Sequence, residues 1–353
     1  MVYKNLFSNE SKTFLHELFY KRKLNFGIYF CCKLILLPFL LSQSACIYNS
    51  NQNSNSKNSD LEFLTILIAP MIYYSQNEME CQTVGTVPIY GNESIRNDSD
   101  FLLTQKTNPI AGVGEFDIPK GRISAPYNID ASGEFVVGGD MIFKNQTPIS
   151  NSEIPIRNYS FGVPNAGLWT GKTVPYTIDP SLEHVSRITR AIDYYDLHTE
   201  IRFIPRTGEA DYVNFRDNDS GCSSKIGKIG GMQNINIDDV CGVASVIHEM
   251  GHAIGLLHEH QRPDRDNFID IFWSNLTPSA TGNLGIWDVT GSFTGVTYAA
   301  YDHCSIMHYG SYTSFNRTYL YPMLVTKEGK TIPYHAGMTQ TDVQTIRNLY
   351  DGI

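Results

Sequence analysis

The chain has 353 residues, a formal net charge of −9, and 42% hydrophobic and 12% aromatic residues. This composition is too apolar for a disordered chain, and the length suits one or two packed domains. A nucleic-acid-binding protein would carry a basic patch, whereas the main basic cluster here is Lys21-Arg22-Lys23. We therefore expect an acidic globular protein with no nucleic-acid partner.

The front of the chain predicts a targeting segment. Basic residues precede an apolar core at 34–41, and a short polar exit ends at Cys46. The apolar run 27–41 has 15 residues and contains Lys33, whereas a membrane-spanning helix needs roughly 20. The order resembles a bacterial lipoprotein signal, although Gln43 stands where leucine is usual. We expect residues 1–46 to direct export, with Cys46 as a lipidation candidate and a plain cleaved signal as the alternative.

Residues 47–60 are almost all Asn and Ser, which predicts a flexible tether. A second apolar run at 61–74 is too short to span a bilayer, so we expect it to be a buried element. Residues 75–157 are rich in Gly, Pro and Asn, with short alternating stretches and no long helical pattern.

Regular elements begin after residue 170. Apolar residues at three- and four-residue spacing predict helices at 181–199 and 240–254. A closing helix at 339–350 has Thr339 as N-cap and Asp342 in the third position of a capping box. Strands are predicted at 173–179, 201–206, 212–216 and 232–237. Helices and strands therefore alternate in an α+β domain of about 190 residues.

The segment at 248–259, HEMGHAIGLLHE, carries the chemistry. His248 and His252 are four residues apart on a helix, so both imidazoles leave the same side and suit one zinc ion. Glu249 lies beside them without being a ligand. Gly255 permits a turn that ends the helix and brings His258 back as a third nitrogen. Three protein ligands leave one position open, which is typical of a catalytic zinc site.

Chance does not explain the motif. A His-Glu-X-X-His string occurs by chance in some chains, but the added Gly255 and His258 reduce that chance to roughly one in tens of thousands. The extended string is the metzincin signature, which requires a later Met-turn, and residues 305–309 (SIMHY) supply a candidate.

Residues 258–266 (HEHQRPDRD) and 301–309 (YDHCSIMHY) resemble the astacin zinc metalloendopeptidases of the metzincin clan. The likeness runs from about residue 167 to 350, and the lipoprotein-like signal suits a bacterial-type member. The resemblance implies an α+β zinc protease domain with a mixed twisted sheet. It also implies two main helices in the N-terminal half, an irregular C-terminal half, and a small pro-segment in front.

The resemblance also assigns roles. His248, His252 and His258 would bind one catalytic Zn²⁺, and Glu249 would be the general base that serves metal-activated water. Met307 would form the floor of the site. Tyr309 would be a mobile extra ligand that stabilises the transition state, with a core tyrosine as the alternative. Residues 232–237 would be the edge strand that binds substrate by β-augmentation.

A latent precursor follows from the same likeness. Residues 138–141 (GGDM) resemble the pro-segment motif whose aspartate coordinates the zinc, here Asp140, although such a turn is also a common surface feature. Glu259 would contact the N-terminus that activation frees. Arg157 is a plausible cut site for an activating protease.

The resemblance implies a Cys222–Cys241 disulfide. The family's other disulfide has no counterpart, so packing would have to hold the C-terminus. Cys304 could pair with Cys81 or remain a free thiol.

We therefore expect signal residues 1–46, a tether at 47–60, a pro-segment at 61–159 and a catalytic domain at 160–353. The expected function is an exported zinc endopeptidase that acts on proteins or peptides, is made as a zymogen and contacts membranes only through a lipid. The alternative is a catalytically quiet surface adhesin on the same fold, against which the presence of Glu249 and Tyr309 argues.

Overall fold

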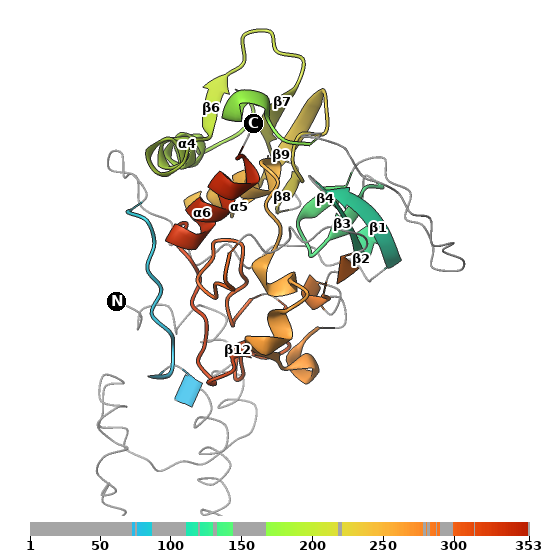
Figure 1. Ribbon diagram of the computed structural model, residues 1–353, viewed down its shortest axis with the longest axis vertical. Helices are drawn as coiled ribbons and strands as arrows, with labels where there is room; N and C mark the ends of the chain where they lie inside the picture. The colour runs from blue at the N-terminus through green and yellow to red at the C-terminus, as the bar shows by residue number, and fades with distance from the viewer. Residues whose placement is uncertain are drawn as a thin grey trace, which may run out of the picture. The chain divides into compact units, whose positions relative to one another are not determined.

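The computed structural model describes residues 73–74, 76–86, 111–118, 121–129, 133–143, 167–217, 221–277, 280, 283–286, 288–289, 299–313 and 315–351. Cys46 and Arg157 lie outside the described residues. The centre of the structure is a mixed sheet with strand order β1-β2-β3-β4-β8-β9-β7-β5-β6 (Figure 1). No helix among the described residues is long and apolar enough to cross a membrane.

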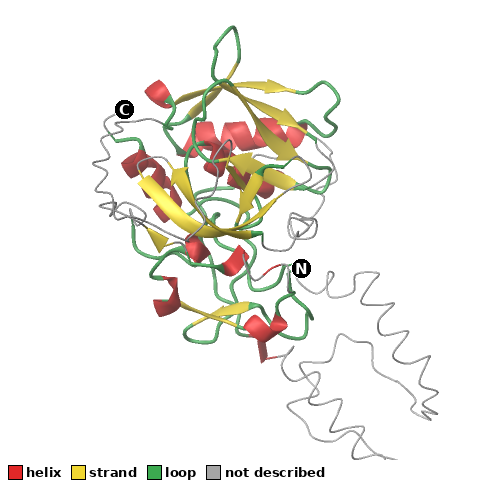
Figure 2. Ribbon diagram, turned by 90° about the vertical axis from the view of Figure 1, so that its right-hand side faces the viewer, coloured by secondary structure: helices red, strands yellow, loops and turns green. Residues whose placement is uncertain are grey.

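The strands predicted after residue 170 form one side of this sheet. They are β5 (Thr173–Ile178), β6 (Arg202–Pro205), β7 (Tyr212–Arg216) and β9 (Met232–Ile237), which pair in parallel. Alternation places Val213 and Phe215 of β7 in the core. Helices α4 (Ser186–His198) and α5 (Val243–Ala253) pack against each other and against the sheet (Figure 2). The mixed sheet and the two main helices confirm the predicted fold class.

The prediction that residues 232–237 form the edge strand is wrong. β9 has β7 on one side and β8 (Cys222–Lys225) on the other, where the pairing is antiparallel. The sequence of β8, CSSK, is short and polar, so it carries no alternating apolar pattern that would identify a strand. On the side of the sheet next to β9, the outer strand of the predicted catalytic domain is therefore β8.

Four strands from before residue 144 extend the same sheet. They are β1 (Gly112–Ile118), β2 (Gly121–Ile129), β3 (Phe135–Val137) and β4 (Met141–Phe143), which form an antiparallel meander. The short strand β11 (Asp288–Val289) pairs with β2. β4 then joins β8 in parallel, with Met141 opposite Ser224. Phe116, Val137 and Met141 share a small core with Ile226, so this meander is packed onto the rest of the sheet.

The C-terminal half is largely irregular, as predicted. It contains the short helices η5 (Glu259–Gln261), η6 (Arg265–Asn267) and η7 (Trp273–Asn275), after the earlier η4 (Thr170–Lys172). A two-stranded sheet joins β10 (Ile269–Ile271) to β12 (Leu324–Thr326). Helix α6 (Gln340–Leu349) closes the fold, and the predicted capping box of Thr339 and Asp342 is present.

The C-terminus is held by packing and by buried hydrogen bonds. Val343, Ile346 and Leu349 of α6 lie in the main hydrophobic core. The buried Tyr350 hydroxyl donates to the Ile254 carbonyl over 2.9 Å.

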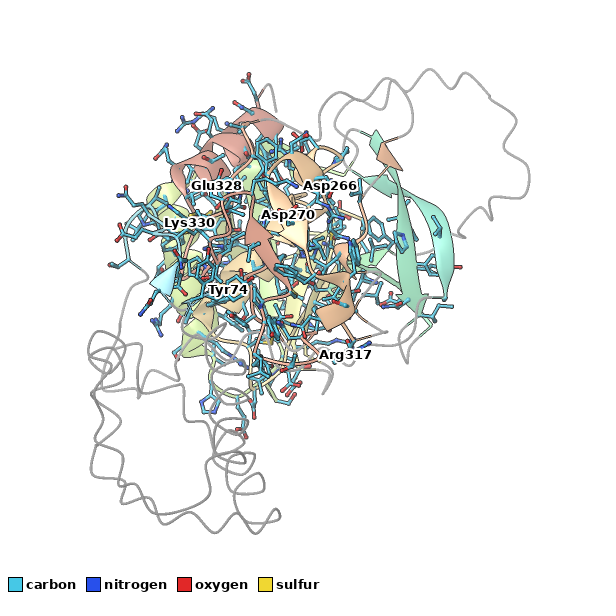
Figure 3. All side chains as sticks on the ribbon, turned by 90° about the horizontal axis from the view of Figure 1, so that it is seen from below. Tyr74, Asp266, Asp270, Arg317, Glu328 and Lys330 are labelled. Atoms are coloured by element: carbon cyan, nitrogen blue, oxygen red, sulfur yellow. A yellow bond between two sulfur atoms is a disulfide. The ribbon has the colours of Figure 1, made fainter. Side chains whose placement is uncertain are left out.

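Residues 73–74 and 76–86 form a strap that runs along the C-terminal half. The Tyr74 carbonyl accepts a hydrogen bond from Thr331 Oγ1, next to Lys330; Tyr74 and Lys330 are labelled in Figure 3. Further along, Val84 N donates to the Met338 carbonyl over 2.8 Å. Tyr73 is exposed, so this end of the apolar run 61–74 is not the buried element that was predicted.

Candidate metal centre

Three imidazole nitrogens converge beside helix α5. His248 and His252 leave the same face of the helix, and Gly255, at φ +108°, turns the chain so that His258 returns to them. The Nε2 atom of His258 lies 3.3 Å from the Nε2 atoms of both other histidines. Nitrogens bound tetrahedrally to zinc at about 2.0–2.1 Å would be about 3.3–3.4 Å apart. The spacing therefore fits a single zinc ion.

The outer nitrogen of each imidazole makes a hydrogen bond that fixes which nitrogen faces inward. The Nδ1 atoms lie 2.8 Å from the Ile306 carbonyl for His248, 2.9 Å from the Leu256 carbonyl for His252, and 2.8 Å from Gln261 Oε1 for His258. Carbonyl and amide oxygens only accept, so each Nδ1 carries the hydrogen. Each Nε2 then has a free lone pair for a metal.

Asp140 completes this group from the N-terminal meander. Its carboxylate oxygens lie 3.0 Å from the Nε2 atom of His258, 3.5 Å from that of His248 and 3.6 Å from that of His252. The side chain is fully buried, and neither oxygen has a hydrogen-bond partner among the described residues. A buried carboxylate without a hydrogen bond is costly unless a cation neutralises it. A metal ion at the centre of the four side chains would remove that cost.

Glu249 lies on α5, beside the three histidines. It is fully buried, and its two carboxylate oxygens lack hydrogen-bond partners in the described part of the chain. Burial, and secondarily the negative charge of Asp140, raise the pKa of Glu249 well above its usual value. A carboxyl group with a raised pKa is suited to accept and return a proton near neutral pH.

The turn at 305–309 packs against α5. A Cβ atom placed on Gly251 would be 2.9 Å from Met307 Sδ, so Met307 lies directly against the helix that carries His248 and His252. The Met307 carbonyl also accepts a hydrogen bond from Glu259 N over 3.0 Å. The role of Met307 as the floor of the site stays a prediction.

Tyr309 is buried at the rim of the same cluster. Its ring stacks on His260 at a centroid distance of 3.9 Å and lies 5.1 Å from the ring of His258. Its hydroxyl donates to the Gly138 carbonyl, two residues before Asp140. The N-terminal meander therefore contacts both the histidine cluster and Tyr309.

Glu259 lies just outside the cluster. It accepts hydrogen bonds from Arg262 Nη1 over 2.7 Å and from Asp302 N over 3.0 Å. Burial raises its pKa to about 7, against the opposing effect of Arg262. Its predicted contact with a freed N-terminus involves residues outside the described part of the chain, so that contact stays a prediction.

Two disulfides connect the described cysteines. Cys222–Cys241 is formed as the resemblance implied. Cys81–Cys304 is also formed, which decides between a pair and a free thiol at Cys304.

Sequence reasoning missed Gln261 and Gly138. The signal for Gln261 was its place three residues after His258, within the segment 258–266 that carries the family resemblance. The contact of Gly138 with Tyr309 has no local signal, because 171 residues separate the two.

Comparison with known proteins agrees with this geometry. The model of the astacin peptidase family matches residues 163–351. Zinc metalloproteinase nas-7 of Caenorhabditis elegans is 37% identical over 207 residues, which cover 57% of this chain and 53% of that protein. The astacin-like metalloendopeptidase of Gallus gallus is 32% identical over 302 residues, which cover 83% of this chain and 69% of that protein.

A solved structure also matches. High choriolytic enzyme 1, a hatching enzyme zinc-protease from Oryzias latipes, has a TM-score of 0.47 and 29% identity, covering 52% of this chain and 92% of that one. The chain spans about half the length of nas-7 and about two thirds of the Gallus gallus protein. Because the family model matches more than half of it, the chain belongs to the astacin family of zinc metallopeptidases.

Proposed function

We propose that the chain is a zinc-dependent endopeptidase that hydrolyses peptide bonds of proteins or peptides and is made as a latent zymogen. The observation that carries this proposal is the convergence of three inward-facing Nε2 atoms beside a buried glutamate. The printed names of the relatives, a zinc metalloproteinase and a metalloendopeptidase, support the same reaction class.

Each side chain has a chemical role in this reaction. His248, His252 and His258 hold the ion, which supplies polarisation of the scissile carbonyl and a lowered pKa for water. Glu249 takes a proton from the attacking water and passes it to the leaving amine. Tyr309, once its hydroxyl is free of Gly138, donates a hydrogen bond to the oxygen that gains negative charge.

Three contacts support latency in the uncut chain. Asp140 lies where a fourth ligand would be, so substrate and water are kept from that position. The Gly138 carbonyl engages the Tyr309 hydroxyl. β4 pairs with β8, which is otherwise the free edge for an extended substrate. The turn at 138–140 and strand β4 thus cover the fourth ligand position, the Tyr309 hydroxyl and the edge of β8.

Activation and export complete the proposal. A protease would cut near Arg157, separating a pro-segment at 61–159 from a catalytic domain at 160–353, and the new N-terminus would contact Glu259. Residues 1–46 would direct export and residues 47–60 would form a tether. Cys46 is the candidate site for a lipid anchor, because the polar exit of the apolar core ends there.

The test uses a chain with two inserted protease sites, one between 87 and 110 and one between 144 and 159, which we call the double-cut chain. It should bind one zinc ion and cleave unfolded protein substrates internally, as mass spectrometry of the products would show. Glu249→Gln should bind zinc equally but react about 10²–10⁴-fold more slowly. Stoichiometric zinc without hydrolysis of any peptide would instead support a binding protein.

A further inference from the structure

The three histidines of the metal centre are not oriented by the same kind of group. The Nδ1 atoms of His248 and His252 donate to the backbone carbonyls of Ile306 and Leu256. Their orientation therefore follows from the fold. The Nδ1 atom of His258 donates to a side chain, Gln261 Oε1, over 2.8 Å.

Gln261 is itself fixed in place. The residue is fully buried in η5, and its Nε2 donates to the Gly285 carbonyl over 3.2 Å. Because the Gly285 carbonyl can only accept, the amide nitrogen must face it and the amide oxygen must face His258. The ring of His258 also stacks on His260 at a centroid distance of 4.8 Å and lies 5.1 Å from the ring of Tyr309, whereas Gln261 is the partner of its Nδ1 atom.

We propose that Gln261 is a positioning residue for the metal centre. By accepting the Nδ1 hydrogen it keeps His258 in the tautomer whose Nε2 lone pair faces the other two imidazoles, and it holds the ring in that plane. This inference rests on the proposed zinc site. Outer hydrogen bonds of this kind typically change metal affinity by about 10–100-fold when they are removed.

Gln233 provides a matched control. It is also buried, donates to the Gly227 carbonyl over 2.8 Å and accepts from Ile229 N over 3.1 Å. Both of its partners are backbone groups and neither is an imidazole. A buried Gln→Met change at 233 therefore repeats the loss of an amide without removing a contact to a zinc ligand.

The experiment measures the zinc affinity of the uncut full chain by competition with a chromogenic chelator. Gln261→Met should weaken zinc binding about 10–100-fold. Gln261→Glu keeps an acceptor for Nδ1 but loses the donor to the Gly285 carbonyl, so its affinity should lie between those of Gln261→Met and the unchanged chain. Gln233→Met should leave zinc affinity unchanged, whatever it does to thermal stability.

Each outcome has a separate meaning. Equal affinity in Gln261→Met and the unchanged chain would overturn the positioning role while leaving the proposed function intact. If Gln261→Met does not fold, Gln261→Ala, which removes the acceptor without adding bulk, takes its place, and unchanged zinc affinity in that variant would overturn the positioning role. If the unchanged chain binds no zinc, the proposed function itself fails.

Discussion

Gly138 occupies a position that other residues would not tolerate. Its φ is +64°, in the left-handed region. A Cβ atom there would be 2.3 Å from Gln261 Oε1 and 2.7 Å from His258 Nδ1. Glycine is therefore required at 138 for two reasons: the left-handed backbone conformation and the lack of space for a Cβ atom. This residue belongs to the turn that brings Asp140 to the histidines.

We predict that Gly138→Ala weakens latency. The left-handed backbone costs a residue with a Cβ about 1–2 kcal/mol, and the contact with Gln261 adds to this. The uncut variant should therefore show peptidase activity at least about tenfold above that of the unchanged uncut chain. Gly133→Ala is the control, since Gly133 also has positive φ, +82°, but has nothing within 4 Å of its Cβ position. An equal rise in the activity of both uncut variants would show that backbone strain alone, and not the contact with Gln261, weakens latency.

At the scale of single residues, sequence predicts what one helix and the turn after it bring together. Helical periodicity places His248 and His252 on one face of α5, and the turn at Gly255 brings His258 back to them. Asp140 was predicted only through a family motif, because it precedes His248 by about 100 residues and local patterns do not relate residues so far apart. Gln261 was missed because a glutamine in a turn is usually a surface residue.

The N-terminal cap of helix α6 also hydrogen-bonds to the Met-turn at 305–309. The buried Asp342 carboxylate accepts from Thr339 N over 2.9 Å, which completes the capping box. It also accepts from Ser305 Oγ over 2.5 Å and from Ile306 N over 2.9 Å. Burial raises the pKa of Asp342 to about 6, although these hydrogen bonds oppose the shift.

This raised pKa predicts a pH dependence of stability. The folded chain binds a proton at Asp342 more tightly than the unfolded chain, so the contribution of this group is complete below about pH 4. It is lost as the pH rises through about 6. Relative to Asp342→Asn, which does not titrate, the unchanged chain should lose about 2 kcal/mol of unfolding free energy between pH 4 and 7. Denaturant unfolding of both chains at several pH values would measure this, and a pH-independent difference would contradict it.

At the scale of elements, sequence predicted the helices and the apolar strands well. α4, α5 and α6 have amphipathic patterns long enough to identify, and β7 alternates clearly. The polar strand β8 has no such pattern, so periodicity does not show that another strand lies outside β9, which the resemblance implied to be the edge. The three-residue strands β10 and β12 are too short for periodicity to indicate them.

One disulfide joins two cysteines that lie before and after the proposed cut in the sequence. Cys81, in the strap, is bonded to Cys304 in the C-terminal half. The meander that carries Asp140 lies between the strap and the cut region at 144–159 in chain order. One cut near Arg157 therefore leaves the meander attached through the strap, and a tethered segment has an effective concentration in about the millimolar range.

We predict that one cut activates the enzyme only partly. Without reductant, a chain cut only between 144 and 159 should keep the fragment that contains Asp140, both on gels and in size-exclusion chromatography. Its peptidase activity should be lower than that of the double-cut chain. The paired variant Cys81→Ser and Cys304→Ser, cut once, should release the fragment more readily in native chromatography. Loss of the fragment from the singly cut, unreduced chain would contradict the tether.

At the scale of the whole molecule, sequence predicted an α+β metallopeptidase domain with a segment in front. It did not predict that this segment extends the main sheet. The joining pair, β4 and β8, is parallel and separated by about 80 residues, and two short strands at that distance leave no signal in local periodicity.

The most direct test of the account is peptide hydrolysis by one preparation before and after both cuts, each with and without a zinc chelator. We predict negligible hydrolysis by the uncut chain and strong hydrolysis by the double-cut chain. Chelator should abolish this activity and added zinc should restore it. Equal activity before and after cutting would contradict latency, and activity that survives complete removal of the metal would contradict the zinc mechanism.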